Sequence, residues 1–268
     1  NESSLKMAQA YHVRRGDKGR YKVISRKGSY HGSTYGTMWL GGHPGFPRTD
    51  YQPKPANVVT VGQPHYYHDT YGATSAEQNG ERAALEIEEA ILFEGPESVS
   101  AVIGEPVSQP LGGVVPPSNY WPMVREICDK YGVLLIFDEV ITGFRVHPNC
   151  FQGHCDIVPD MTALAKVLAG GLPGGCLAGR ADLMEALAFD NPHGQKMKHP
   201  GTYNANPLSA AAGVAALDIV ATAEPSNKAN ESAAKLRQSL NQIFAEKSSR
   251  LVAYGDFSAI KIHATSRD

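Results

Sequence analysis

The sequence predicts an α/β fold with a mainly parallel sheet, and two observations lead to this prediction. Segments typical of strands alternate with segments typical of helices along most of the 268 residues. Residues 133–137, VLLIF, are all apolar, as expected for a strand that is covered on both faces at the centre of a sheet. With 42% hydrophobic and 19% charged residues, the chain can bury a sizeable core.

The first half of the chain alternates regularly. Gly16 ends the first helix, and the glycine-rich turn GSYHGS follows the first strand. The helix at 81–93 ends at Gly95 and has apolar residues at the spacing of a half-buried helix: Leu85, Ile87, Ala90, Ile91 and Leu92. We expect helices at 1–14, 34–40, 81–93 and 120–131, and strands at 22–25, 58–61, 99–103 and 133–137.

The second half is expected to complete the sheet and to begin another unit. A short, mostly apolar segment at 162–168 runs into a cluster of glycines at 170–175. The last helix has Leu236, Leu240 and Ile243 on one face. We expect helices at 181–188, 207–221 and 228–247, a further sheet strand at 176–178, and two strands of a separate antiparallel piece at 250–254 and 259–263.

The charge balance and the apolar runs exclude two classes of partner. Lys and Arg total 25 against 27 for Asp and Glu, so no basic excess indicates a nucleic acid partner. No apolar run is long enough to cross a bilayer, so we expect no membrane association. The four cysteines form no Cys-x-x-Cys pair and are expected to be reduced thiols, which favours a cytoplasmic protein.

Two loops contain residue types that bind zinc, but their spacing does not favour a metal site. They lack the paired spacing of a structural zinc site, so no metal is expected. The residues considered are His147, Cys150, His154 and Cys155 in one loop, and His65, His68 and Asp69 in the other.

Asp138 stands where the apolar strand ends, in LLIFDEVITGF. Ligands of open α/β sheets bind outside the carboxyl ends of the strands. A carboxylate at that point can pair with a protonated ring nitrogen and keep a pyridinium cofactor an effective electron sink. The same side chain can instead cap the next turn. Taken alone, the residue does not separate the two interpretations.

Lys166 lies in the apolar segment LAKVLAGGLPGG, which runs into a glycine-rich turn. Apolar surroundings disfavour the ammonium form, so such an amine can be neutral near pH 7 and attack an aldehyde. A lysine that extends from the edge of a helix into water is the alternative.

Two further segments have weaker signals. Tyr30 in SYHGST is an aromatic ring that can stack on a flat cofactor or simply pack. Thr202 and Asn204 precede a predicted helix, where hydroxyl and amide groups suit either a helix cap or an anion such as phosphate.

In this order, the segments resemble the class III aminotransferases, a family of fold-type I pyridoxal-phosphate enzymes that includes ω-transaminases and glutamate-1-semialdehyde aminomutase. The resemblance covers nearly the whole chain through SYHGST, AVIGEPV, DEVITGF, PDMTALAKVLAGGLPGG and GTYNANPLSAAAG. It implies pyridoxal 5'-phosphate as the cofactor. It also implies a mainly parallel sheet with helices on both faces and the start of a C-terminal α+β small domain.

The resemblance implies the roles of three central residues. Lys166 matches the Schiff-base lysine, which also acts as the proton shuttle. Asp138 matches the partner of the pyridinium nitrogen, and Val140 matches the residue that packs against the other face of the ring.

Five more residues are implied around the cofactor. Tyr30 matches the aromatic residue that stacks on the ring, with His31 and Gly32 beside it. Glu105 matches an acidic residue in the active site. Thr202 matches a phosphate ligand that reaches into the neighbouring subunit's site, which implies a homodimer.

The resemblance also implies a domain division. Residues 1–222 correspond to the large cofactor-binding domain, incomplete at its N-terminus, and 223–268 to the beginning of the small domain. A Ser-Gly-x turn that grips the phosphate is expected before Asn1, and a substrate-binding arginine beyond Asp268. We therefore expect the active protein to be longer.

The implied reaction is a ping-pong transfer of an amino group from an amino acid or amine to a keto acceptor. The alternative within the family is an intramolecular transfer of the glutamate-1-semialdehyde 2,1-aminomutase kind. A non-catalytic domain that binds metal or ligand through the histidine and cysteine loops is a reading from another class, and a degenerate family member is a third. The presence of both Asp138 and Lys166 favours an enzyme.

Overall fold

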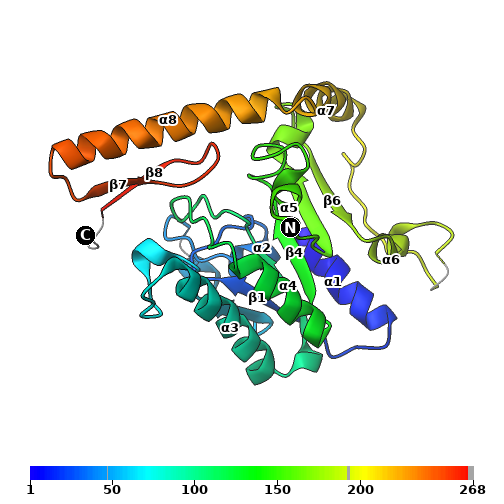
Figure 1. The fold of residues 1–268 in the computed structure, drawn as a ribbon. Coiled ribbons are helices and arrows are strands. Elements are labelled where there is room, and N and C mark those ends of the chain that lie inside the picture. The colour runs from blue at the N-terminus through cyan, green and yellow to red at the C-terminus, as the bar shows by residue number, and fades with distance from the viewer. Residues whose placement is uncertain (47, 192–193, 265–268) are drawn as a thin grey trace.

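A six-stranded sheet forms the centre of the molecule, in the order β2-β1-β3-β4-β5-β6 (Figure 1). The computed structural model describes residues 1–46, 48–191 and 194–264. Strands β1 to β5 are parallel, and β6 pairs antiparallel with β5. The strands are β1 (Lys22–Arg26), β2 (Val58–Val61), β3 (Val99–Gly104), β4 (Leu134–Asp138), β5 (Met161–Ala165) and β6 (Gly175–Gly179). The predicted α/β class and mainly parallel sheet are confirmed.

Helices cover both faces of this sheet. Successive side chains of a strand point to opposite faces, and β4 follows this rule: Leu135 and Phe137 belong to one core cluster, whereas Leu134 and Ile136 belong to the other. The first cluster is covered by α3 (Ala76–Glu94) and α4 (Tyr120–Tyr131), and the second by α1 (Glu2–Arg14), α2 (Tyr35–Leu40) and α6 (Ala181–Met184).

Several short helices connect these elements. The helix α5 (Cys150–Cys155) follows β4. The 3-10 helices are η1 (Thr49–Tyr51), η2 (Tyr66–His68), η3 (Pro96–Ser98), η4 (Lys166–Ala169) and η5 (Glu185–Leu187). The segment expected at 162–168 therefore divides into the end of β5 and η4.

The helix α3 differs from its predicted form in two ways. It begins at Ala76, earlier than expected, because the side chain of Ser75 accepts a hydrogen bond from the N–H of Gln78 at 3.1 Å and caps the helix. Its apolar side chains do not all face the core. Leu85 and Leu92 are 39% and 54% exposed, whereas Ile87 and Ile91 are fully buried.

The last part of the chain forms a separate layer beside the sheet. Helix α8 (Glu224–Glu246) runs along the top of Figure 1, and the antiparallel hairpin of β7 (Leu251–Tyr254) and β8 (Lys261–Ala264) lies beneath it. The helix α7 (Pro207–Val220) precedes them. Among the described residues no single helix is long and apolar enough to cross a membrane. Helices α7 and α8 pass that test only together, and they are bent by 64°.

Candidate active site

The carboxyl ends of neighbouring parallel strands bring several of the predicted residues together. Asp138 is the last residue of β4, and Lys166 follows β5 directly. His31 lies in the turn after β1, and Glu105 follows β3. Because Asp138 pairs with Ala163 across β4 and β5, the strand register sets the positions of Asp138 and Lys166 on one edge of the sheet. We call this edge the carboxyl edge.

The Asp138 carboxylate is buried and accepts three hydrogen bonds. His31 Nδ1 donates to Oδ2 at 2.8 Å, and Asn1 Nδ2 donates to the same oxygen at 2.6 Å. The backbone N–H of Val140 donates to Oδ1 at 3.1 Å. Only 4% of Asp138 and 3% of His31 are exposed. These three hydrogen bonds therefore fix the orientation of the Asp138 carboxylate.

Hydrogen bonding keeps Asp138 ionised despite its burial. Burial raises the pKa of a carboxyl because the anion loses its water. The hydrogen bond and electrostatic attraction of His31, together with the N–H of Val140, outweigh burial and hold the pKa of Asp138 below its ordinary value. Asp138 is therefore an anion at neutral pH.

The neighbouring acid, Glu139, has a different role. Its fully buried carboxylate accepts hydrogen bonds from the N–H groups of Phe151 at 2.6 Å and Gln152 at 3.2 Å, and from the Thr142 hydroxyl at 3.0 Å. The carboxylate thus supplies hydrogen-bond acceptors for two backbone N–H groups in the first turn of α5. Burial raises the pKa of Glu139 more than these donors lower it. Glu139 is a structural residue that holds α5 against the end of β4.

Glu105 joins the turn after β1 to β3. Its Oε1 accepts the backbone N–H of Tyr30 at 3.1 Å, and its Oε2 lies 3.5 Å from Nη2 of Arg26. Arg26 is buried, and its guanidinium lies 5.1 Å from the ring centroid of Trp121. Removing one partner of such a buried pair leaves the other charge uncompensated. This pair therefore fixes the turn that carries Tyr30 and His31.

Lys166 has an unusual backbone and a perturbed amine. Its φ of +52° lies in the left-handed region, which costs a side chain with a Cβ about 1 kcal/mol or more and is found mostly at functional sites. The side chain is exposed in the single chain. Partial desolvation of the ammonium lowers the pKa of Lys166, Asp138 acts in the opposite direction, and Arg145 lowers it further. A larger share of this amine is therefore neutral than for an ordinary lysine.

Tyr30 and Gly32 line a cavity of about 510 Å³ beside this edge. The Tyr30 ring packs on Phe46, with centroids 4.7 Å apart. Gly32 has a φ of +131°, and a Cβ there would lie 2.7 Å from Oγ1 of Thr37, so only glycine fits between the turn and α2.

Thr202 is not part of this assembly within the single chain. It lies exposed in the turn before α7, and no hydrogen bond between described residues joins it to Asp138, Lys166 or Tyr30. The cap of α7 is Asn206, whose side chain accepts the N–H groups of Leu208 and Ser209, and not one of the two residues considered from the sequence.

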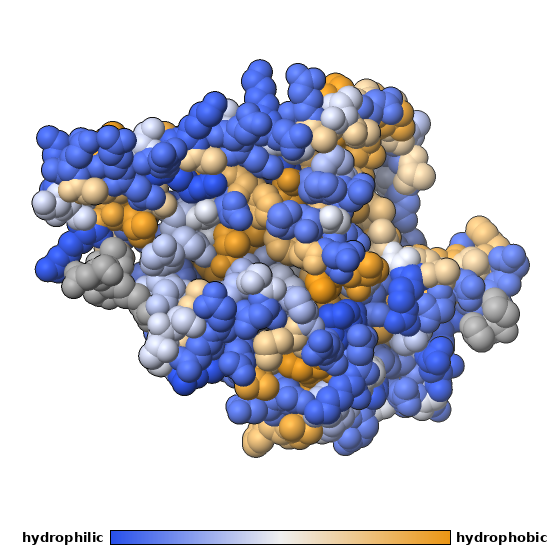
Figure 2. Space-filling model, viewed as in Figure 1, coloured by the Kyte–Doolittle hydropathy of each residue, from blue (hydrophilic) through white to orange (hydrophobic). Residues whose placement is uncertain are grey.

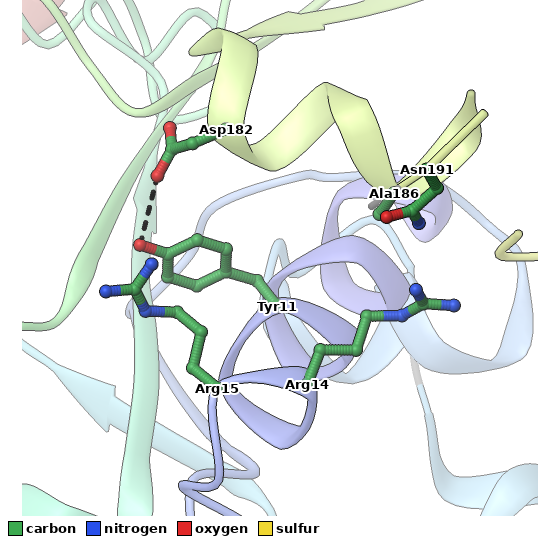
Figure 3. A pocket seen from close by; sticks show the side chains of 6 residues that line it. All are labelled: Tyr11, Arg14, Arg15, Asp182, Ala186 and Asn191. Carbon is green, nitrogen blue, oxygen red and sulfur yellow. Dashed lines mark hydrogen bonds between the residues drawn. The ribbon is translucent and has the colours of Figure 1, made fainter. Parts of the chain in front are cut away.

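A second pocket lies away from the carboxyl edge (Figure 3). It has a volume of about 260 Å³ and lies between α1 and the segment from α6 onward. The hydroxyl of Tyr11 donates to Oδ2 of Asp182 at 3.2 Å, and Arg14 and Arg15, which follow Tyr11 along the chain, also line the pocket. None of the predicted site residues lines this pocket, so we do not assign the chemistry to it.

Sequence reasoning missed two residues of the site. Asn1 donates to both Asp138 and the backbone carbonyl of His31, at 2.6 and 2.8 Å. Arg26 holds Glu105. An arginine at the end of the strand KVISR, after Val23 and Ile24, is a signal for a buried ion pair, because a fully buried charge needs a partner. Asn1 offers no comparable signal.

Comparisons with known proteins agree with this geometry. A family model described as aminotransferase class-III matches residues 1–267. The chain is 32% identical over 244 residues to gamma aminobutyrate transaminase 2 of Solanum lycopersicum, covering 90% of this chain and 53% of that protein. It is 32% identical over 269 residues to a glutamate-1-semialdehyde 2,1-aminomutase of Natronomonas pharaonis, covering 100% of this chain and 56% of that protein.

Solved structures of transaminases are also similar to this chain. An (S)-enantioselective omega-transaminase from Thermomicrobium roseum has a TM-score of 0.87 at 31% identity, covering 100% of this chain and 58% of that chain. An amine transaminase from an uncultivated Pseudomonas species, described in a PLP-bound form, has a TM-score of 0.87 at 31% identity, with coverages of 96% and 58%. The chain thus spans little more than half the length of these relatives. It belongs to the class III aminotransferases.

Proposed function

We propose that the protein is a pyridoxal-phosphate-dependent aminotransferase that moves an amino group from an amino acid or amine to a keto acceptor. One observation carries this proposal: a buried, ionised carboxylate at the end of β4 stands beside a lysine of lowered pKa at the end of β5. Titratable groups with shifted pKa values at the carboxyl ends of parallel strands are candidates for catalysis. The family relationship of the chain supports the same assignment.

The residues at the carboxyl edge fit pyridoxal 5'-phosphate. A carboxylate has about four acceptor positions, and three donors occupy those of Asp138, so one remains for a ring N–H. Nε2 of His31 is buried without a partner among the described residues, which leaves a polar atom for a ligand to satisfy. Tyr30, Gly32 and Val140 complete the proposed surroundings of the ring. When bound, the cofactor supplies an aldehyde that accepts amino groups and a ring that absorbs negative charge.

Each residue at the carboxyl edge would then have its own role in the reaction. Asp138 keeps the ring nitrogen protonated, because its low pKa leaves it ionised. Lys166 would hold the cofactor, and its free amine would be the base that accepts the proton from the carbon bearing the substrate's amino group. Its lowered pKa favours the neutral amine that this step requires. Glu105 and Arg26 hold the turn that positions Tyr30 and His31.

The test is a spectrum of the purified protein before and after borohydride reduction, with mass spectrometry of the peptide that contains Lys166. We expect a reducible yellow band and a matching mass increase on Lys166. A Lys166→Ala variant is the control and should show neither. Absence of both signals in the wild type, even with added pyridoxal phosphate, would refute the proposal.

An intramolecular amino transfer is the second candidate. The aminomutase of Natronomonas pharaonis matches the whole chain at 32% identity, and its similarity is as high as that of the transaminase from tomato. The same residues of the carboxyl edge serve either reaction. Conversion of a single amino-aldehyde substrate without any added keto acid would favour the aminomutase. Strict dependence on a keto acceptor would favour the aminotransferase.

We propose that two copies of the chain form a homodimer, with Thr202 reaching the partner's cofactor phosphate. Hydrophobic residues of α7 gather on the surface at the upper right of Figure 2. Leu208, Val214 and Ile219 are 70%, 61% and 61% exposed, and such a patch marks an interaction surface. Thr202 lies in the exposed turn just before this helix. Sedimentation at two protein concentrations tests the dimer, and a monomer at both would contradict it.

The domain division is also a proposal. Residues 1–222 would form the large cofactor-binding domain and 223–268 the beginning of the small domain. The break falls at Ala223, whose φ of +62° ends one helical segment and starts α8. Beyond it, α8 packs on the β7–β8 hairpin rather than on the central sheet.

The proposed partners and location follow from composition. The formal charge of −2 favours small-molecule substrates over nucleic acids. All four cysteines are free thiols, which favours a reducing compartment such as the cytoplasm. Alkylation of all four under native and denaturing conditions, without reductant, tests the thiol state.

A further inference from the structure

Three histidines from distant parts of the sequence converge beside the β7–β8 hairpin. His65 precedes the short helix η2 and His68 is its last residue, whereas His263 lies in β8, 195 residues beyond His68. One ring nitrogen of each lies within 4.8 Å of the others. We call these three residues the histidine cluster. Its residues take no part in the carboxyl edge.

The hydrogen bonds of His263 direct a lone pair into the cluster. Nε2 of His263 lies 3.0 Å from the backbone carbonyl of Gly112, and because a carbonyl only accepts, this nitrogen carries the proton. Nδ1 is therefore the unprotonated nitrogen, and it faces Nε2 of His68 at 3.3 Å. Histidines that bind metals commonly donate their other N–H to a backbone carbonyl in this way.

His65 supplies a second, independent observation. It is only 7% exposed, and neither of its ring nitrogens has a hydrogen-bond partner among the described residues. A buried polar atom without a partner costs about 1–3 kcal/mol, so the imidazole is in an unfavourable position unless something binds it. The ring stacks on Tyr254 at a centroid distance of 5.9 Å, which holds it beside His263.

The spacing suits a tetrahedral ion. With Zn–N bonds of about 2.0–2.1 Å, two ligand nitrogens of a tetrahedral site lie about 3.3 Å apart. The His68–His263 pair has this separation already. The nitrogen of His65 lies within 4.8 Å of the other two, so metal binding requires it and its partners to approach by at most about 1.5 Å.

We propose that His65, His68 and His263 bind a divalent transition-metal ion of the zinc class, with water in the fourth position on the exposed side of His68. Imidazole is a preferred ligand of zinc, and three protein ligands plus water is a common zinc arrangement. Burial lowers the pKa of His65 to about 4, with His68 and His263 contributing, so the ring is neutral at pH 7 and one of its nitrogens offers a lone pair. The bound ion joins the hairpin to the loop at residues 65–68.

Asp69 is excluded from the ligand set by its own contacts. Its carboxylate accepts the N–H of Tyr71 at 3.3 Å, the N–H of Ala73 at 2.8 Å and the side-chain amide of Asn79 at 2.6 Å. These hydrogen bonds occupy the carboxylate and hold it against the loop before α3. The other loop considered from the sequence, with His147 and His154, forms no group of three ligand atoms close enough for a metal among the described residues.

The experiment uses protein without an affinity tag, dialysed against a chelator and then titrated with Zn²⁺ alone. We expect one ion per chain by metal analysis, and a tetrahedral absorption spectrum when Co²⁺ replaces Zn²⁺. His68→Ala should weaken zinc binding on the order of 100-fold or more, because even the loss of a residue that only orients a ligand costs 10–100-fold. His68 is exposed, so this variant should fold even if His65→Ala does not.

The matched control is His154→Ala, which removes an exposed histidine from the other candidate loop. It should bind zinc as the wild type does. Equal binding by His68→Ala and His154→Ala, or no ion at a ratio of one per chain, would overturn the proposal and leave a hydrogen-bonded pair of histidines. The borohydride-reducible band of the proposed function serves as a separate readout and should be the same in both variants.

Discussion

The carboxyl edge and the histidine cluster differ in how their polar atoms are satisfied. At the carboxyl edge, Asp138 accepts three hydrogen bonds from its own chain, so its carboxylate is held in place before any ligand arrives. In the histidine cluster, the ring nitrogens of His65 have no partner among the described residues. Asp138 is therefore preorganised by protein contacts, whereas the ring nitrogens of His65 are satisfied only when a ligand binds.

The largest expected effect tests the assignment of Lys166. Lys166→Ala should reduce turnover about 1,000-fold or more, because it removes both the attachment of the cofactor and the base. Steady-state kinetics with an amino donor and a keto acid measures this loss. Lys166→Arg keeps the charge but should be nearly as inactive, since guanidinium stays protonated. Activity close to wild type in either variant would remove the carboxyl edge as the catalytic centre.

A smaller effect separates the two adjacent acids. Asp138→Asn keeps the shape of the side chain but removes its charge, and we expect turnover to fall on the order of 100-fold. Glu139→Gln should instead lower the free energy of unfolding by about 1–3 kcal/mol, with the reaction largely retained, because its carboxylate caps α5. Urea denaturation and kinetics on both variants check this. The reverse pattern would exchange the two roles.

Zinc should stabilise the wild-type protein but not a cluster variant. At a free concentration of 100 times its Kd, an ion that binds only the folded state adds about 2.7 kcal/mol. For a chain of this size that corresponds to a rise in Tm of about 2–4 °C per kcal/mol. Calorimetry with and without Zn²⁺ measures it, and His68→Ala should show no rise. An equal rise in both proteins would place the ion elsewhere.

The smallest expected effect is a pH dependence of the metal-free protein. The folded-state pKa of His65 is lowered from 6.5 to about 4, so below pH 6.5 the unfolded chain binds more protons than the folded one. Stability should therefore decrease as the pH falls from 6.5 towards 4. His65→Phe should remove that part of the slope. Denaturation curves at several pH values in chelator test it, and identical slopes would show that His65 does not contribute.

The sequence could predict what local patterns encode. The apolar run at 133–137 predicted a central strand, and β4 is that strand. The binding of a ligand at Asp138 stays a prediction. The start of α3 was harder to predict because it depends on the cap by Ser75, and the exposure of Leu85 and Leu92 depends on which face α4 leaves open. The assignments that rest on the family resemblance, such as Thr202 at a neighbouring subunit, stay predictions.

Contacts between distant residues could not be predicted from local patterns. The histidine pair at 65 and 68 was considered without its third member, because His263 comes close only through the packing of the hairpin. The contact of Asn1 with Asp138 spans 137 positions and has no sequence signature. Likewise, the left-handed backbone of Lys166 follows from the junction of β5 and η4, and no glycine or asparagine signals it.

Asp138 and Glu139 lie on opposite sides of one strand end, so the hydrogen-bond register of β4 decides which acid faces the carboxyl edge. Asp138 lies on the side of Asn1 and His31, and Glu139 on the side of Phe151. A slip of one residue against β5 would turn every side chain to the other face. Asp138 would then leave the side of Asn1 and His31, and Glu139 would no longer reach the N–H groups of Phe151 and Gln152. Which of the two acids reaches the carboxyl edge is therefore decided by the pairing of β4 with β5.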